Sequence, residues 1–390
     1  MARDSATSHD HGRIIHEVQW SEALPWWLLF RAAGTAFAPT VILLALLGSL
    51  ATWAGWSICD SLRVPGADPA ADAILDATLS GPALGVPAGA DPLRITSPSR
   101  AALPALRSAW TWLPRPAADV LELVAIPFRP TATLAQMSGA LARLGWFVLV
   151  WSIFGTGIAR HVALKLIDED APGLVGSALY GARKWLAAFN SVGFVLLGIV
   201  ALSIPGAILG LLMRTEWGLA VAGAVWPLVL AGAVVLAILA IGLVAGWPMM
   251  VAAVGVERGD SFQAISTAFS YLYQRPLHYA FYAAVALVVA VPALAAAGLF
   301  ADVTSTFALW AASLGMGHER TRTVLEGLAR PDTAAWGLRA LGFWTRGLES
   351  LLGSFGWGYF WAIATAAYML LRHDVDGTEL DEVVIDEPGM

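Results

Sequence analysis

The sequence predicts an all-α integral membrane protein, a polytopic helical bundle of about six transmembrane helices with a parallel internal repeat. Of its 390 residues, 58% are hydrophobic and only 13% are charged, and the mean hydropathy is +0.67. An ordinary soluble domain is about half apolar and about a quarter charged. A chain so poor in charge would leave large apolar patches facing water. We therefore predict a multi-pass membrane protein.

Six stretches are long and apolar enough to cross about 30 Å of hydrocarbon, which takes roughly 20 helical residues. They are residues 36–58, 140–161, 187–211, 225–254, 279–300 and 351–371. The fourth is longer than a perpendicular helix requires, so we expect it to tilt or to kink at a proline. Tryptophans such as Trp26, Trp53 and Trp247 fall near span ends, where indole rings favour the membrane interface.

The remaining segments are predicted to lie outside the bilayer. Residues 1–35 form a polar cytoplasmic N-terminus that leads into the interface, and residues 372–390 form an acidic cytoplasmic tail. Residues 59–139 are an extracytoplasmic connection rich in Ala and Pro. Residues 301–350 are predicted extracytoplasmic amphipathic helices that lie on the bilayer. Basic residues near span ends favour this orientation, with both termini in the cytoplasm, across a bacterial inner membrane.

A self-similarity indicates that part of the chain is duplicated. Asp170 matches Asp260, 90 positions later, and apolar residues that follow the two aspartates match as well. Each aspartate is predicted to cap a short amphipathic elbow helix. Repeat 1 covers residues 140–211 and repeat 2 covers residues 225–300, each as span, elbow helix, span. Both copies run in the same direction, which implies a pseudo-twofold axis along the membrane normal.

The second elbow also carries a resemblance. The stretch 247–254, followed by Glu257 and Asp260 and then by residues 271–279, resembles uncharacterised multi-pass bacterial membrane proteins with an amphipathic elbow helix between two spans. The resemblance covers residues 186–299 and rests on this one elbow. It implies a type of fold and no activity.

The sequence contains few groups that could perform chemistry. The cores of the six predicted spans contain no ionisable side chain, which weighs against proton- or sodium-coupled transport and against a metal or haem site within the membrane. No serine lies in a Gly-x-Ser-x-Gly motif, and no phosphate-binding loop is followed by Lys-Ser or Lys-Thr. The scattered basic residues form no patch for nucleic acid. We expect no catalytic residue, no metal and no cofactor.

Small residues and prolines mark the predicted contacts between spans. Glycines four residues apart let helix backbones approach closely in a membrane, and prolines at membrane depth kink helices. An asparagine in the same region either joins helices by hydrogen bonding or binds a substrate. The candidate positions of the repeat interface are Asn190, Pro205, Gly206, Gly210, Gly242, Gly246 and Pro248.

These observations favour a non-enzymatic structural or accessory component, with membrane lipids and another membrane protein as partners. The alternative is a permease or a flippase-like carrier for an apolar or lipidic substrate. A carrier requires a cavity at mid-membrane depth near Asn190, Pro205 and Pro248. A structural component requires a filled repeat interface and an exposed small-residue or aromatic face.

Overall fold

A computed structural model describes residues 24–62, 64, 120, 123–128, 132–329, 336–380 and 382–383. Within these residues every regular element is a helix, which confirms the all-α fold. Residues 1–23 of the predicted N-terminus and most of the predicted connection 59–139 lie outside the described residues. The elements are η1 (Pro25–Trp27), α2 (Leu28–Thr35), α3 (Pro39–Ser61), η2 (Ile126–Phe128), α7 (Leu134–Leu166), α8 (Leu174–Leu212), α9 (Glu216–Glu257), α10 (Ser261–Gln274), α11 (Pro276–Met316), α12 (His318–Ala329) and α13 (Trp336–Asp376).

Five helices of the described residues are long and apolar enough to cross a membrane: α3, α7, α8, α9 and α11. The chain is therefore built as a multi-pass membrane protein. The predicted sixth span, residues 351–371, lies in α13, which is not one of the five. Its glycines, Ser354, tryptophans and tyrosines lower its hydropathy, and all of its residues from Trp361 to Leu371 are buried among the other helices.

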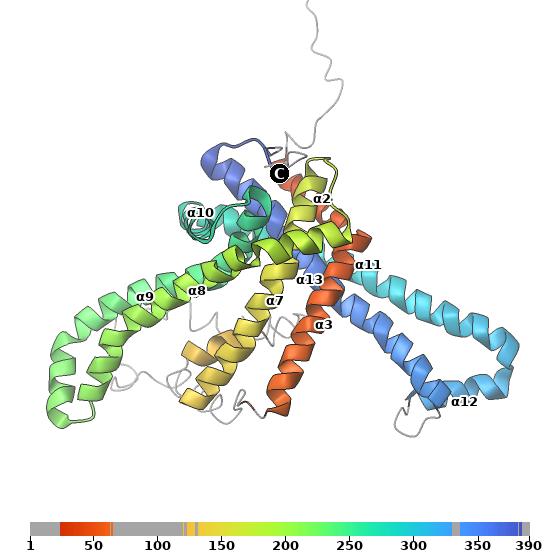
Figure 1. Ribbon diagram of the computed structural model, residues 1–390, viewed down its shortest axis with the longest axis horizontal. Coiled ribbons are helices and arrows are strands. Elements are labelled where there is room, and N and C mark those ends of the chain that lie inside the picture. Colours follow the sequence, from red (N-terminus) through yellow and green to blue (C-terminus); the bar gives the residue numbers. More distant parts are fainter. Residues whose placement is uncertain are drawn as a thin grey trace, which may run out of the picture.

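The helices converge at one end and spread apart at the other (Figure 1). The α8–α9 hairpin leaves the bundle on one side, and α11, α12 and the first half of α13 leave it on the opposite side, with α3 and α7 between them. The elbow helix α10 and the end of α13 lie at the converging end. Of the five candidate spans in the described residues, α7 is the one that is largely enclosed: 78% of its most apolar stretch is buried, against 11% for α8 and 6% for α9.

Aromatic residues fill the centre of the converging helices. Trp151 of α7 and Trp361 of α13 are completely buried, with their ring centroids 6.0 Å apart. Trp247 of α9 meets Trp361 edge-on at 5.2 Å and Phe147 at 5.4 Å. The ring of Trp247, which was predicted to lie near a span end, thus packs against other helices of the bundle. Aromatic pairs in such tilted geometries are favourable beyond the area that they bury.

Two glycines let α7 and α8 pack backbone to backbone. A Cβ atom on Gly181 of α8 would lie 2.0 Å from the carbonyl oxygen of Ile153, and one on Gly157 of α7 would lie 2.6 Å from the carbonyl oxygen of Ser177. No other residue type fits at these crossings without moving a helix. The first half of α8 is thereby held against α7.

The two predicted elbows differ. The second is a separate helix, α10, whose N-cap Asp260 accepts a hydrogen bond from the backbone N–H of Gln263 at 2.8 Å, as predicted. The first elbow is continuous with the following span in α8, and its N-cap position is held by Gly173 without a side-chain bond. Asp170 is therefore not a cap. Pro276 explains the difference, because it forces Arg275 out of the helical conformation, whereas no proline follows the first elbow.

The predicted amphipathic helices of residues 301–350 are helical but not all separate. Helix α11 continues without a break from its span to Met316 and ends at Gly317, whose φ of +74° suits glycine. Helix α12 is separate, and α13 runs on from Trp336 into the bundle. These segments therefore extend the spans as long arms.

Replacing Gly181 by Ala is expected to destabilise the protein by about 1–3 kcal/mol, because the new Cβ atom overlaps the backbone of α7. Gly193→Ala on the same helix has open space around the new Cβ atom and should be neutral or slightly stabilising. Thermal unfolding of the two purified variants in the same detergent checks this. Equal unfolding temperatures would contradict the close crossing.

Asp260→Ala is expected to weaken α10 by about 1 kcal/mol, because the backbone N–H of Gln263 loses its acceptor. Hydrogen exchange of the Ser261–Gln274 amides should accelerate roughly fivefold. Asp170→Ala is the matched control, and we expect no change in the amides of α8. Acceleration in both variants would mean that Asp170 acts as a cap after all.

Candidate functional site

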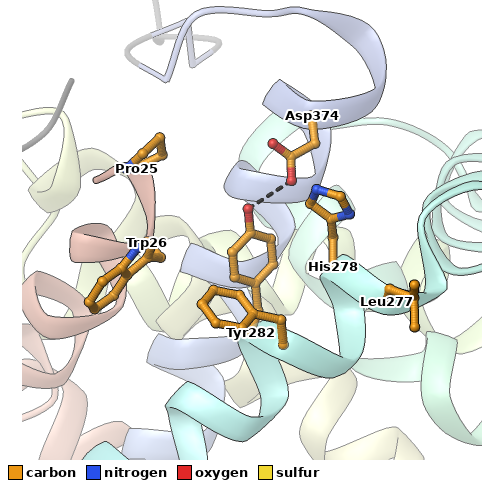
Figure 2. Close-up of a pocket in the computed structure, with 7 residues that line it drawn as sticks. Pro25, Trp26, Leu277, His278, Tyr282 and Asp374 are labelled. Atoms are coloured by element: carbon orange, nitrogen blue, oxygen red, sulfur yellow. Dashed lines mark hydrogen bonds between the residues drawn. The ribbon is translucent and has the colours of Figure 1, made fainter. Parts of the chain in front are cut away.

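A pocket of about 370 Å³ opens at the converging end of the bundle, where the first described residues meet the end of α13. Its volume falls within the range of small-molecule sites, roughly 300–1,000 Å³. Three segments build it: η1, the first turns of α11 and the last turn of α13 (Figure 2). The residues that line it are Pro25, Trp26, Leu277, His278, Phe281, Tyr282 and Asp374.

Local sequence places these side chains. Pro276 begins α11, so His278, Phe281 and Tyr282 fall on its first turns at spacings of three and four residues. Pro25 begins η1 and brings Trp26 to the opposite wall. Asp374 lies in the last turn of α13.

Asp374 occupies an electrostatically unfavourable position, because the C-terminal end of a helix carries partial negative charge. The hydroxyl of Tyr282, which is buried, donates a hydrogen bond to its Oδ2 atom at 2.7 Å (Figure 2). Within the described residues, Asp374 forms no ion pair with a lysine, arginine or histidine. A carboxylate held by a neutral phenol at the edge of a pocket is an attractive partner for a cation.

Aromatic rings form most of the remaining wall. Trp26 and Phe281 meet at right angles with their centroids 6.4 Å apart, and Phe281 lies 5.7 Å from Tyr282. His278 is 6.5 Å from the Tyr282 ring. Aromatic faces beside a carboxylate bind positively charged groups, so this arrangement suits recognition of a cation.

A second polar cluster joins α9, α10 and α13 near the pocket. Glu257 accepts hydrogen bonds from Tyr368 and from Nε2 of Gln263, the latter at 2.8 Å. Nε of Arg372 lies 3.3 Å from Oε1 of Glu257, and the two side chains are only 16% and 14% exposed. Because both charges are shielded from water and each has further partners, the pair ties α9 to α13.

Tyr271 of α10 donates a hydrogen bond to Asp376, two residues after Asp374. Burial raises the pKa of the Tyr271 phenol well above its usual value, and the hydrogen bond to Asp376 raises this pKa further. The phenol therefore stays protonated and remains a donor. Phenols of α10 and α11 thus hold both aspartates at the end of α13.

Helix α7 also contains two buried arginines. The prediction that the cores of the spans lack ionisable side chains did not anticipate them. Nη2 of Arg143 lies 2.9 Å from Oδ1 of Asp60 at the end of α3. Arg160 is 1% exposed, and its guanidinium carbon lies 5.4 Å from the centre of the Tyr180 ring. Both residues lie near the ends of the predicted span 140–161. Side chains at span ends are expected to reach the interface, so their burial was not predicted.

The candidate glycines of the second repeat, Gly242 and Gly246, pack against the elbow helix α10. A Cβ atom on Gly242 would lie 2.5 Å from the ring of Phe269, and one on Gly246 would lie 3.8 Å from Cβ of Ala268. Both partners belong to α10, so these glycines of α9 seat the elbow helix. Pro248, in the following turn of α9, is buried.

Within the described residues, Pro205, Gly206 and Gly210 of the first repeat do not form the predicted interface. Pro205, Gly206 and Gly210 lie in the exposed outer half of α8, and no heavy atom lies within 4 Å of a Cβ atom built on either glycine. The prediction that they pack against another part of the repeat is wrong, because the hairpin leaves the bundle before these residues. Asn190 is half-buried closer to the bundle. None of Asn190, Pro205 and Pro248 lines either of the two best-formed pockets of the described residues.

The described residues contain no group of three His, Cys, Asp or Glu side chains that could hold a metal ion. No protein-family model, curated protein or solved structure matches this chain. Its function is therefore inferred from the geometry alone.

Glu257→Ala is expected to cost about 3–5 kcal/mol, because it leaves the shielded Arg372 guanidinium without its carboxylate. Glu326→Ala is the matched control: Glu326 also pairs with an arginine, Arg322, but both side chains of this pair are well exposed, so the cost should stay below about 1 kcal/mol. Thermal unfolding in detergent measures both. A similar loss in the two variants would argue against a structural tie through Glu257.

Proposed function

We propose that the protein is a non-enzymatic structural or accessory component of a membrane, and that its α8–α9 hairpin packs against another integral membrane protein. One observation carries this proposal: the most apolar stretches of α8 and α9 are 11% and 6% buried, although both helices belong to a chain with a well-packed centre. The two helices contact each other and extend away from the bundle (Figure 1). A surface of this kind is available to an outside partner.

The glycines of the hairpin favour a protein as that partner. Gly206 and Gly210 of α8, and Gly223 and Gly232 of α9, have open space where a side chain would be. Glycine inside a helix costs about 0.5–1 kcal/mol relative to alanine, and lipid tails gain nothing from its small size. A neighbouring helix gains from the small size of glycine, because its backbone can then approach closely. The alternative is that lipid alone covers this surface, and the native mass spectrometry described below distinguishes the two.

The membrane that we propose is a bacterial cytoplasmic membrane, with both termini in the cytoplasm. The excess of basic residues near the corresponding span ends supports that orientation. The placement of η1 and Asp374 beside one pocket agrees with termini on one side. The alternative of a permease or flippase-like carrier gains no support from Asn190, Pro205 and Pro248, since they lie in separate surroundings.

Gly210→Leu is expected to release the partner without unfolding the protein, because the added side chain occupies open space in this chain and blocks a helix that approaches it. Native mass spectrometry of protein extracted gently from its own membrane is the measurement. Wild type should carry a stoichiometric protein partner, and Gly210→Leu should carry none while keeping its unfolding temperature.

Gly145→Leu on α7 is the matched control, since Gly145 also has open space around its Cβ position but lies outside the hairpin. It should retain the partner. A wild-type protomer that carries only lipid, or a partner that survives Gly210→Leu, would overturn the proposed protein contact.

A further inference from the structure

The pocket between η1, α11 and α13 joins a wall that contains a carboxylate and aromatic rings to a long apolar surface. Leu277 and Phe281, which line the pocket, begin a row on one side of α11 that continues along the helix at helical spacing. The exposed fractions of its large side chains run from 47% to 81%. The row consists of Leu277, Phe281, Val288, Val291 and Leu299.

We propose that this pocket binds the ammonium group of a zwitterionic phospholipid, of the ethanolamine or choline type, whose acyl chains lie along this row on α11. The proposal deepens the proposed function by assigning a lipid to a second site. It depends on the placement of the chain in a membrane and not on the partner of the α8–α9 hairpin.

Charge and ring geometry select the headgroup. The carboxylate of Asp374 supplies negative charge, and the aromatic rings of Trp26, Phe281 and Tyr282 line the same pocket. An ammonium ion gains from both, since a cation is attracted to aromatic faces and to a carboxylate. A lipid with an anionic, amine-free headgroup, such as phosphatidylglycerol, gains from neither and is repelled by Asp374.

The position of the pocket selects a lipid over a free amine. Trp26 lines the pocket, and its neighbour Trp27 is exposed. Tryptophans of this kind mark the headgroup level of a membrane. The apolar row on α11 begins at the same rim and leads away from the converging end of the bundle. A bound headgroup therefore has an apolar surface beneath it for its chains.

The test is native mass spectrometry of the full-length purified protein in an equal mixture of phosphatidylethanolamine and phosphatidylglycerol with identical acyl chains. Wild type is expected to retain the ethanolamine lipid in roughly tenfold preference. Asp374→Asn should bring that preference close to parity. The asparagine oxygen still accepts the hydrogen bond from Tyr282, so the change removes the charge and preserves the fold.

Trp26→Ala tests the aromatic wall separately and should also reduce the preference. Asp302→Asn and Trp310→Ala are the matched controls, since both residues lie farther along α11 and line no part of the pocket. They should keep the wild-type preference. Equal retention of the two lipids by wild type, or an unchanged preference in Asp374→Asn, would overturn the proposal.

A further arm distinguishes a lipid from a free amine. Val288→Gln makes the apolar row polar and should weaken retention of the ethanolamine lipid, whereas binding of free phosphoethanolamine should stay weak in every variant. Tight binding of phosphoethanolamine that is insensitive to Val288→Gln would overturn the assignment to a lipid. Gly210→Leu should keep the wild-type lipid preference, so loss of the hairpin's partner and loss of this site are separate results.

Discussion

The structure depends on close packing around the inner half of α7. Three glycines make this possible: Gly157 and Gly181 where α7 meets α8, and Gly155, where a Cβ atom would lie 2.8 Å from the Trp361 ring of α13. With α7 enclosed in this way, the large rings of Trp151 and Trp361 fill the space that remains. Interiors packed to this density respond to added volume with strain. The convergence of the helices at one end follows from this set of contacts.

The fold class was predictable from composition and from uninterrupted apolar length, since those properties decide whether a chain is more stable in lipid than in water. The cap at Asp260 was predictable as well, because it is a local interaction. The two aspartates did not predict whether an elbow is a separate helix or continuous with the following span. It depends on the proline that follows Arg275 in one copy and is missing from the other.

The candidate site could not be predicted from the sequence for the most part. Its residues come from three distant segments, and none of Trp26, Tyr282 and Asp374 belongs to a spacing that predicts binding. The one available signal was Asp374 close behind an apolar span, where an acid opposes the helix dipole. The spacing of glycine pairs was also ambiguous. Gly242 and Gly246 lie against α10, whereas no described heavy atom lies within 4 Å of a Cβ atom built on Gly206 or Gly210. Spacing shows that a helix can be approached closely, and only the tertiary structure shows what approaches it.

The last turn of α13 connects the separate parts of the molecule. Arg372 pairs with Glu257 at the end of α9, and Asp376 accepts a hydrogen bond from Tyr271 of α10. Asp374, between them, accepts one from Tyr282 in the pocket. Three polar residues at alternate positions near the end of α13 thus contact α9, α11 and α10. Because α9 is also one half of the exposed hairpin, the turn of α13 that carries Asp374 also holds the end of that hairpin helix through Arg372 and Glu257.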